Sequence, residues 1–136
     1  MQNKANKAMQ RAVVIGLAVS VLIVAAACAI PASIMKRMEK ECIPLLIDAR
    51  ECALSENYSD AREMLQQAVS ITEKRTDRLE FFFDHNILAE LELKLRTACD
   101  LTHTRESSQL IAEIDGAIGR LKFLSGITRA GIGEVM

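Results

Sequence analysis

The side chains best suited to chemistry are the adjacent Asp84 and His85, which follow Phe82 and Phe83. A carboxylate beside an imidazole can serve general acid–base catalysis, but it also needs a nucleophile or a bound water in a pocket. The sequence offers no such partner, so we predict no catalytic residue, and an enzyme that uses this pair remains only a third hypothesis. We expect a structural corner instead, in which the Phe residues seal a helical turn. His85 would then lie near a helix C-terminus, where the helix dipole favours a charged imidazole.

The cysteines are the other reactive groups. None forms a Cys-x-x-Cys pair or stands near a histidine at the spacing of metal ligands, so we predict no metal site and no cofactor. Cys52 and Cys99 occupy matching places in a faint internal repeat with an offset of 47 residues. A Cys52–Cys99 disulfide is therefore an alternative to small buried thiols, and it would need an oxidising compartment.

A long apolar segment near the N-terminus is the clearest structural signal. Residues 12–30 contain no charged side chain, and Pro31 follows them. At 1.5 Å per residue this segment spans about 28 Å, close to the ~30 Å thickness of a bilayer's hydrocarbon core. We therefore predict a transmembrane anchor over residues 12–31.

Two other interpretations of this segment stay open. A cleaved signal peptide usually has a shorter apolar region of about 7–15 residues. A lipoprotein signal is suggested by Cys28, because the preceding Val24-Ala25-Ala26-Ala27 loosely resembles a lipobox. In that case Cys28 would be lipidated; otherwise it is a small apolar residue in a membrane helix.

Basic residues flank the apolar segment on both sides. The short N-terminal tail, residues 1–11, holds three cations and no acid, and three more cations follow the segment at Lys36, Arg37 and Lys40. Because the tail is short and positively charged, we expect a single-pass protein in the cell membrane with its N-terminus in the cytoplasm. Residues 33–136 would then be extracytoplasmic.

The remainder of the chain is predicted to be helical throughout. Apolar residues recur every three or four positions over about 33–55, 58–83, 87–102 and 105–125, with a kink expected at Pro44. Asn57 is expected to cap the second segment, whose stripe includes Ile71 and is interrupted by Arg75. The stripes of the third and fourth segments include Leu88, Leu91, Leu95, Leu110, Ile114 and Leu121. Gly116 and Gly119 would weaken the last segment, and a close helix crossing or simple tolerance would explain them. The predicted fold is all-α: one transmembrane helix followed by a bundle of about four helices, arranged as two helical hairpins over residues 33–125. Glycines in residues 126–136 predict a flexible C-terminal tail.

The charge of the predicted bundle argues against one class of partner. Subtracting the three cations of the tail leaves 14 basic against 18 acidic side chains. A mildly acidic surface without a basic stripe is unsuited to binding phosphate backbones. We therefore expect no nucleic-acid partner.

Two short motifs resemble those of the bacterial family called domain of unknown function 4363. One is Phe82-Phe83-Asp84-His85 with the acidic, Leu-periodic helix after it, and the other is Leu121-Lys122-Phe123-Leu124. Arg78 and Leu79 stand where that family often has a Trp. The resemblance implies one N-terminal membrane helix followed by paired helices. It implies no activity.

Together these features favour a non-enzymatic, membrane-anchored interaction or accessory module at the cell envelope. Its expected partners are the lipid bilayer and either another membrane or envelope protein or a second copy of itself. The alternative is a lipoprotein-like module, anchored through Cys28, that binds a small ligand between its hairpins.

Overall fold

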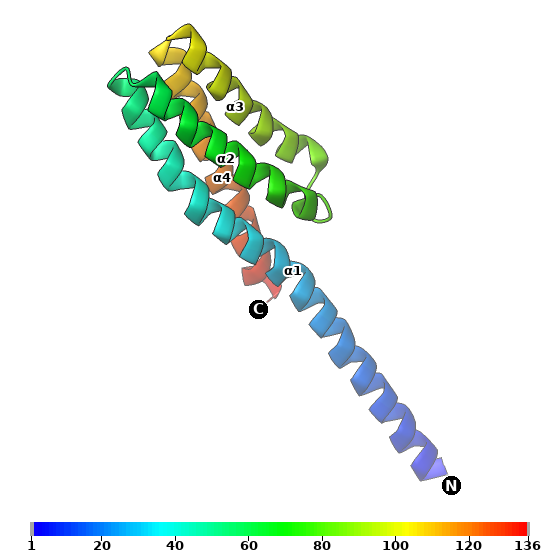
Figure 1. The fold of residues 1–136 in the computed structure, drawn as a ribbon. Helices are drawn as coiled ribbons and strands as arrows, with labels where there is room; N and C mark the ends of the chain where they lie inside the picture. Colours follow the sequence, from blue (N-terminus) through cyan, green and yellow to red (C-terminus); the bar gives the residue numbers. More distant parts are fainter. Residues whose placement is uncertain (1, 136) are drawn as a thin grey trace.

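The computed structural model describes residues 2–135 of the chain, with side chains described through residue 130. Four helices make up nearly all of it, and no strand occurs within this range. They are α1 (Gln2–Leu54), α2 (Tyr58–Leu79), α3 (His85–Thr104) and α4 (Ser107–Val135). Figure 1 shows the first half of α1 projecting as a stem from a bundle made of the other helices and the second half of α1. The prediction of an all-helical chain is confirmed.

The first helix is longer than the sequence pattern indicated. A break was expected after residue 31 and a kink at Pro44, but α1 is a single helix of 53 residues that contains both Pro31 and Pro44. A proline removes one backbone donor and crowds the preceding turn, yet neighbouring packing can hold such a helix together. Pro31 is buried where the bundle begins, whereas the ring of Pro44 faces solvent. The stem and the bundle are therefore joined by continuous helix, about 80 Å long in total.

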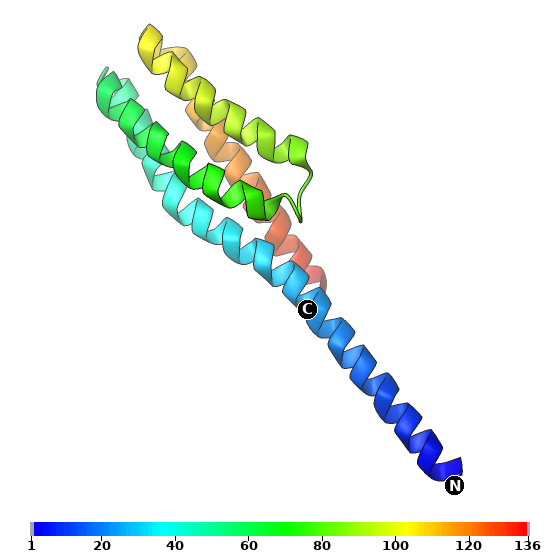
Figure 2. The same cartoon turned by 45° about the vertical axis from the view of Figure 1, so that its right-hand side comes forward.

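Each helix of the bundle packs against two others. α1 contacts α2 and α4, and α3 contacts the same two helices. No Cα atom of α1 lies within 8 Å of one in α3, and the same holds for α2 and α4. α1 and α3 are thus diagonal across the bundle, and Figure 2, turned from the first view, shows the same side-by-side arrangement.

The core is built from residues spaced three or four apart along each helix, the pattern of helix bundles. On α1 the stripe begins at Pro31 and runs through Met35, Met38, Cys42, Leu46, Ala49 and Ala53. The stripes of α3 and the first part of α4 are the predicted ones, including Leu88, Leu91, Leu95, Leu110, Ile114 and Leu121. On α2 two threonines, Thr72 and Thr76, take core positions, whereas Ile71, expected in the stripe, is only partly buried. Arg75, expected to interrupt the stripe, pairs with Glu41 on α1.

An ion pair crosses every contact seam of the bundle. Two join α1 to α4 (Arg50–Asp115 and Arg129–Glu39), one joins α1 to α2 (Arg75–Glu41), one joins α2 to α3 (Arg96–Glu73), and two join α3 to α4 (Lys94–Glu113 and Arg120–Glu90). Exposed pairs of this kind contribute about 0.2–1 kcal/mol each, so their main effect is on the register between helices rather than on total stability.

The C-terminal segment differs from the flexible tail expected over residues 126–136. α4 continues as helix to Val135, and its last described core residues, Leu124, Ser125 and Thr128, are buried. The Ser125 hydroxyl donates to the carboxylate of Glu39 on α1, which also accepts from Arg129. These contacts hold the end of α4 against α1, so the glycines there lie in helix. Residue 136 lies outside the described range.

Candidate functional site

The two ends of the bundle carry different surfaces, and both are candidate sites. The proximal end lies next to the stem and contains the loop between α2 and α3, residues 80–84. The distal end lies at the far side and contains the α1–α2 and α3–α4 turns. The sequence-predicted corner, residues 82–85, falls at the proximal end.

Asp84 and His85 do not form a catalytic pair in this loop. Asp84 is the N-cap of α3, and its carboxylate accepts from the backbone N–H of Asn86 at 3.0 Å. The His85 Nδ1 atom lies 3.1 Å from a carboxylate oxygen of Glu80, with the His85 side chain 75% exposed. His85 is thus the first residue of α3 and not a residue at the C-terminus of α2, so the expected interaction with the α2 dipole is corrected to a pairing with Glu80.

The expected role of the phenylalanines is only partly met. Phe83 is half-buried and packs against the core, as a residue sealing the corner should. Phe81 is 88% exposed and Phe82 40% exposed, so these two rings face outward. They border a hollow of about 600 Å³ whose opposite wall is α1 at Ala29 and Ile30. The apolar rings therefore lie beside the last residues of the apolar stem.

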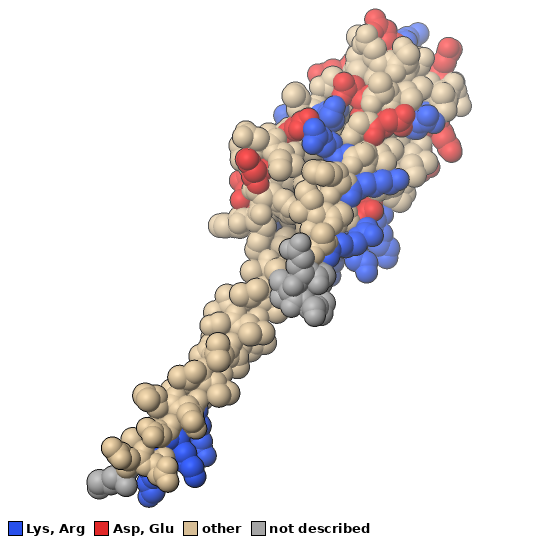
Figure 3. All heavy atoms as spheres, turned by 180° about the vertical axis from the view of Figure 1, so that it is seen from behind, with Lys and Arg blue, Asp and Glu red and all other residues tan. Residues whose placement is uncertain are grey.

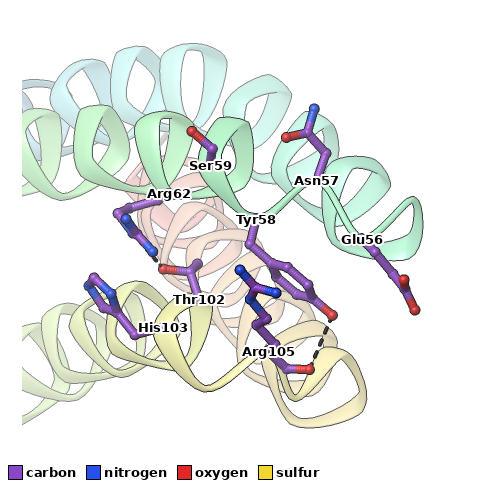
Figure 4. Close-up of a pocket in the computed structure, with 8 residues that line it drawn as sticks. All are labelled: Glu56, Asn57, Tyr58, Ser59, Arg62, Thr102, His103 and Arg105. Atoms are coloured by element: carbon purple, nitrogen blue, oxygen red, sulfur yellow. Dashed lines mark hydrogen bonds between the residues drawn. The ribbon is translucent and has the colours of Figure 1, made fainter.

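The distal end carries a hollow of about 680 Å³ where the two turns meet (Figure 4). Its lining is almost entirely polar and comes from both turns: Glu56, Asn57, Tyr58, Ser59, Arg62, Thr102, His103 and Arg105. One pair of residues with the offset of the sequence repeat, Tyr58 and Arg105, meets at this hollow. The Tyr58 hydroxyl donates to the backbone carbonyl of Arg105 at 3.1 Å.

Local backbone geometry fixes both turns of this distal hollow. Glu56 and Arg105 have positive φ angles of 58° and 59°, the left-handed conformation that ends a helix. Asn57 caps α2 as predicted, accepting from the backbone N–H of Asp60. The Arg62 Nε donates to the Thr102 hydroxyl at 3.0 Å, which ties α2 to α3 beneath the opening. The hollow can offer hydrogen bonds and two guanidinium groups to a polar or anionic group, but it contains no arranged nucleophile and base.

The cysteines do not pair in the structure. All four are free thiols, Cys42 being buried and Cys28, Cys52 and Cys99 partly buried. The proposed Cys52–Cys99 disulfide is wrong for this fold, because Cys52 lies on α1 and Cys99 on α3. Their Cα atoms are more than 8 Å apart, and a disulfide needs about 4.4–6.8 Å. Burial raises the pKa of the Cys99 thiol, and the Asp100 carboxylate raises it further.

The fold brings together two groups of residues that were not predicted from the sequence. Arg37 and Glu41 from α1 meet Lys74, Arg75 and Arg78 from α2 around a second proximal hollow of about 380 Å³. Tyr58 and Arg62 meet Thr102 and Arg105 at the distal end. The offset of 47 could have indicated the distal group, whereas the proximal one depends on the register between α1 and α2.

Among the described residues, no cluster of three or more His, Cys, Asp or Glu side chains could hold a metal ion. One helix, α1, is long and apolar enough to cross a membrane, and its most apolar window is not buried at all by the rest of the chain. Comparisons with protein-family models, with curated proteins and with solved structures find no match to this chain.

Proposed function

We propose that this chain is a single-pass membrane protein whose stem anchors the helical bundle at the surface of the cell membrane. The observation that carries the proposal is the exposure of the apolar stem on every side. Its exposed large apolar side chains, from Met9 to Ile30, are between 49% and 68% exposed. A core helix of a water-soluble protein would bury one face, so a helix apolar all round and unburied needs another apolar environment.

The charges at the two ends of the stem support this placement. Lys4, Lys7 and Arg11 mark one end, and Lys36 is the first charged residue at the other. Figure 3 shows blue side chains near the N-terminal end of the stem and others on the bundle, with no charged side chain visible along the stem between them. We propose that the N-terminus is cytoplasmic and that the bundle, with the two helical hairpins α1–α2 and α3–α4, is extracytoplasmic.

The bundle is proposed to act as a non-enzymatic interaction or accessory module at the envelope. Its polar distal hollow faces away from the membrane, and its lining comes from two turns that hold each other by hydrogen bonds. Such a preformed, solvent-facing surface suits contact with another envelope protein or with a second copy of this chain.

Site-specific thiol labelling tests anchoring and orientation together. The native cysteines are replaced by alanine, and a single cysteine is placed at Ser55 on the distal end or at Gln10 in the tail, both exposed positions. We expect Ser55→Cys to react with an impermeant maleimide in intact cells and Gln10→Cys only after permeabilisation. The reverse pattern would invert the orientation. Recovery of both variants in the soluble fraction would overturn the anchoring.

A lipoprotein-like module that binds a small ligand is the second candidate. Cys28 lies three residues before Pro31, where the buried stripe of α1 begins, so cleavage before Cys28 would leave the core intact. The ligand would occupy the distal hollow. Metabolic labelling with a fatty acid, lost on Cys28→Ala, would support this candidate. A purified protein whose mass includes the uncleaved N-terminus would exclude it.

A further inference from the structure

Two hollows lie next to each other on the proximal part of the α1–α2 seam, and Arg78 lines both. The hollow nearer the stem, called the lower one, is mainly apolar, with Phe81 and Phe82 on one side and Ile30 and Ile34 of α1 on the other. The upper one is lined by the four cations Arg37, Lys74, Arg75 and Arg78. An apolar hollow directly below a cationic one matches the division of a phospholipid into acyl chain and phosphate.

The cationic hollow has an excess of positive charge even after its internal ion pair is counted. Glu41 is the one carboxylate in its lining, and both of its oxygens accept from Arg75 at 2.9 Å. Arg37, Lys74 and Arg78 are exposed on the same seam. Guanidinium groups bind phosphate oxygens through paired, charge-assisted hydrogen bonds, so this arrangement is suited to a phosphate monoanion.

The position of the two hollows along the axis of α1 agrees with the position proposed above for the membrane. From Arg11 to Lys36, α1 covers about 37 Å of helix, slightly more than the ~30 Å hydrocarbon core of a bilayer. A core centred between these two charges has its outer edge close to Ser33. Phe81 and Phe82, which face Ser33 and Ile30, would then lie at the boundary between acyl chains and headgroups. Arg37 would lie about one turn higher, at the level of the phosphates.

The exposure of Phe81 needs an explanation that the bundle alone does not provide. Its ring is 88% exposed, more than any other large apolar side chain described, and it neighbours a second exposed ring. Aromatic side chains on the apolar face of interfacial segments insert into the headgroup and acyl boundary, with Lys and Arg on the polar face above them. The proximal end has this arrangement.

We propose that the proximal α1–α2 seam binds an anionic phospholipid of the membrane that α1 crosses. The phosphate lies between Arg37, Lys74 and Arg78, and an acyl chain lies along Phe81, Phe82 and Ile30. This inference rests on the proposed membrane anchoring. It adds a second contact that fixes the bundle upright on the bilayer.

A single tryptophan reports on the apolar half of this site, because the chain contains no tryptophan of its own. Phe81→Trp is compared with Leu54→Trp, an exposed position on α1 at the distal end. Each full-length variant is placed in nanodiscs with brominated acyl chains. We expect a blue-shifted emission and strong bromine quenching for Phe81→Trp, and quenching mainly by aqueous acrylamide for Leu54→Trp. Equal acrylamide quenching of the two variants would overturn the lipid site.

The charged half is tested by comparing nanodiscs of phosphatidylcholine with nanodiscs containing phosphatidylglycerol. We expect phosphatidylglycerol to increase the bromine quenching of the tryptophan at position 81 and to be retained by the protein in native mass spectrometry. Adding Arg37→Gln and Arg78→Gln should abolish both effects. Lys122→Gln, an exposed cation on α4 outside both hollows, should change neither. Equal behaviour in the two lipids, or no effect of the double variant, would overturn the anionic site.

Flotation of vesicles separates this inference from the proposal on which it rests. If the chain does not float with the vesicles, the membrane anchoring itself is wrong. If it floats and the tryptophan at position 81 is still open to acrylamide, the anchoring stands and the lipid site is wrong.

Discussion

Cys42 and Thr72 form a small polar contact inside the core of the bundle. The Cys42 Sγ atom lies 3.8 Å from the Thr72 hydroxyl, which donates to the Ala68 carbonyl. Burial raises the pKa of the Cys42 thiol, while the hydrogen bond with Thr72 partly offsets this. A buried thiol of this kind stays protonated and is slow to react.

This thiol makes the stability of the bundle depend on alkaline pH. Above the ordinary thiol pKa the unfolded chain loses the Cys42 proton while the folded chain keeps it. This lowers the free energy of the unfolded state and makes the folded state less stable relative to it. The buried Cys42 thiol therefore contributes fully to stability below the ordinary thiol pKa, and this contribution is lost as the pH rises through the raised pKa of the folded state. We expect the melting temperature of the wild type, followed by circular dichroism in detergent, to fall more between pH 8 and pH 10 than that of Cys42→Ser.

The serine variant is a matched comparison because it keeps a small hydrogen-bonding side chain and does not titrate in this range. Cys52 and Cys99 are present in both proteins, and their effects cancel in the difference. An identical pH dependence of the two proteins would contradict the prediction.

The hydrophobic pattern alone was enough to predict the apolar core residues but not the polar ones. Leu88, Leu91 and Leu95 on α3 are buried as predicted, because no polar residue competes for the inward face. Thr72 and Thr76 could not be chosen from the pattern. Their hydroxyls hydrogen-bond to Ala68 and Glu92, which makes burial acceptable, but those partners are known only from the fold.

At the level of elements, two of the glycines in α4, Gly116 and Gly119, have different environments. A Cβ atom at Gly119 would meet nothing within 4 Å, whereas at Gly116 it would meet the Lys94 side chain at 3.4 Å. The helix crossing that Gly119 had suggested is therefore absent at that position. Each glycine instead weakens the helix through its larger conformational entropy in the unfolded chain.

Gly119→Ala is accordingly expected to stabilise the bundle by about 0.5–1 kcal/mol, since alanine reduces that entropy without a clash. Gly116→Ala should give a smaller gain, because Lys94 must move and its ion pair with Glu113, at 3.8 Å, is disturbed. Thermal unfolding in detergent measures both changes. A lower melting temperature for Gly119→Ala than for the wild type would show that this position is not open.

The ends of helices could be predicted where a capping residue marks them. They could not be predicted from the prolines. Asn57 caps α2 as its sequence context indicated. Pro31 and Pro44 were read as a boundary and a kink, but α1 passes through both. Packing against α2 and α4 compensates for the lost backbone hydrogen bonds, and that packing is not visible in the local sequence.

The whole molecule divides into an exposed stem and a bundle that contains the core. Among the residues whose side chains the structure describes, the buried ones begin at Pro31 and end at Thr128. The apolar residues of the sequence therefore fall into two groups, those exposed on the stem and those buried in the core of the bundle. The two proximal hollows lie where these groups meet, which is why neither pattern alone predicted them.

Residues 31–136 alone are expected to form a helical bundle that is soluble without detergent and unfolds cooperatively, because truncation removes no core contact. A second fragment, residues 39–136, loses Pro31, Met35 and Met38. Removing a buried Met side chain costs about 2–5 kcal/mol, so this fragment should unfold at a much lower temperature or fail to fold. Circular dichroism with analytical ultracentrifugation measures both. An insoluble or unfolded 31–136 fragment would show that the stem is needed for folding.

The unbroken α1 has a mechanical consequence for the molecule. Because a single helix crosses from stem to bundle, the rotational phase of its residues is continuous, and the core stripe that starts at Pro31 extends back along one line of the stem through Cys28, Val24, Val21 and Leu17. A twist of the stem about its axis must therefore turn the bundle by the same angle. If the stem crosses a membrane as proposed, any contact that fixes its rotation about the helix axis also fixes the direction in which the distal hollow faces.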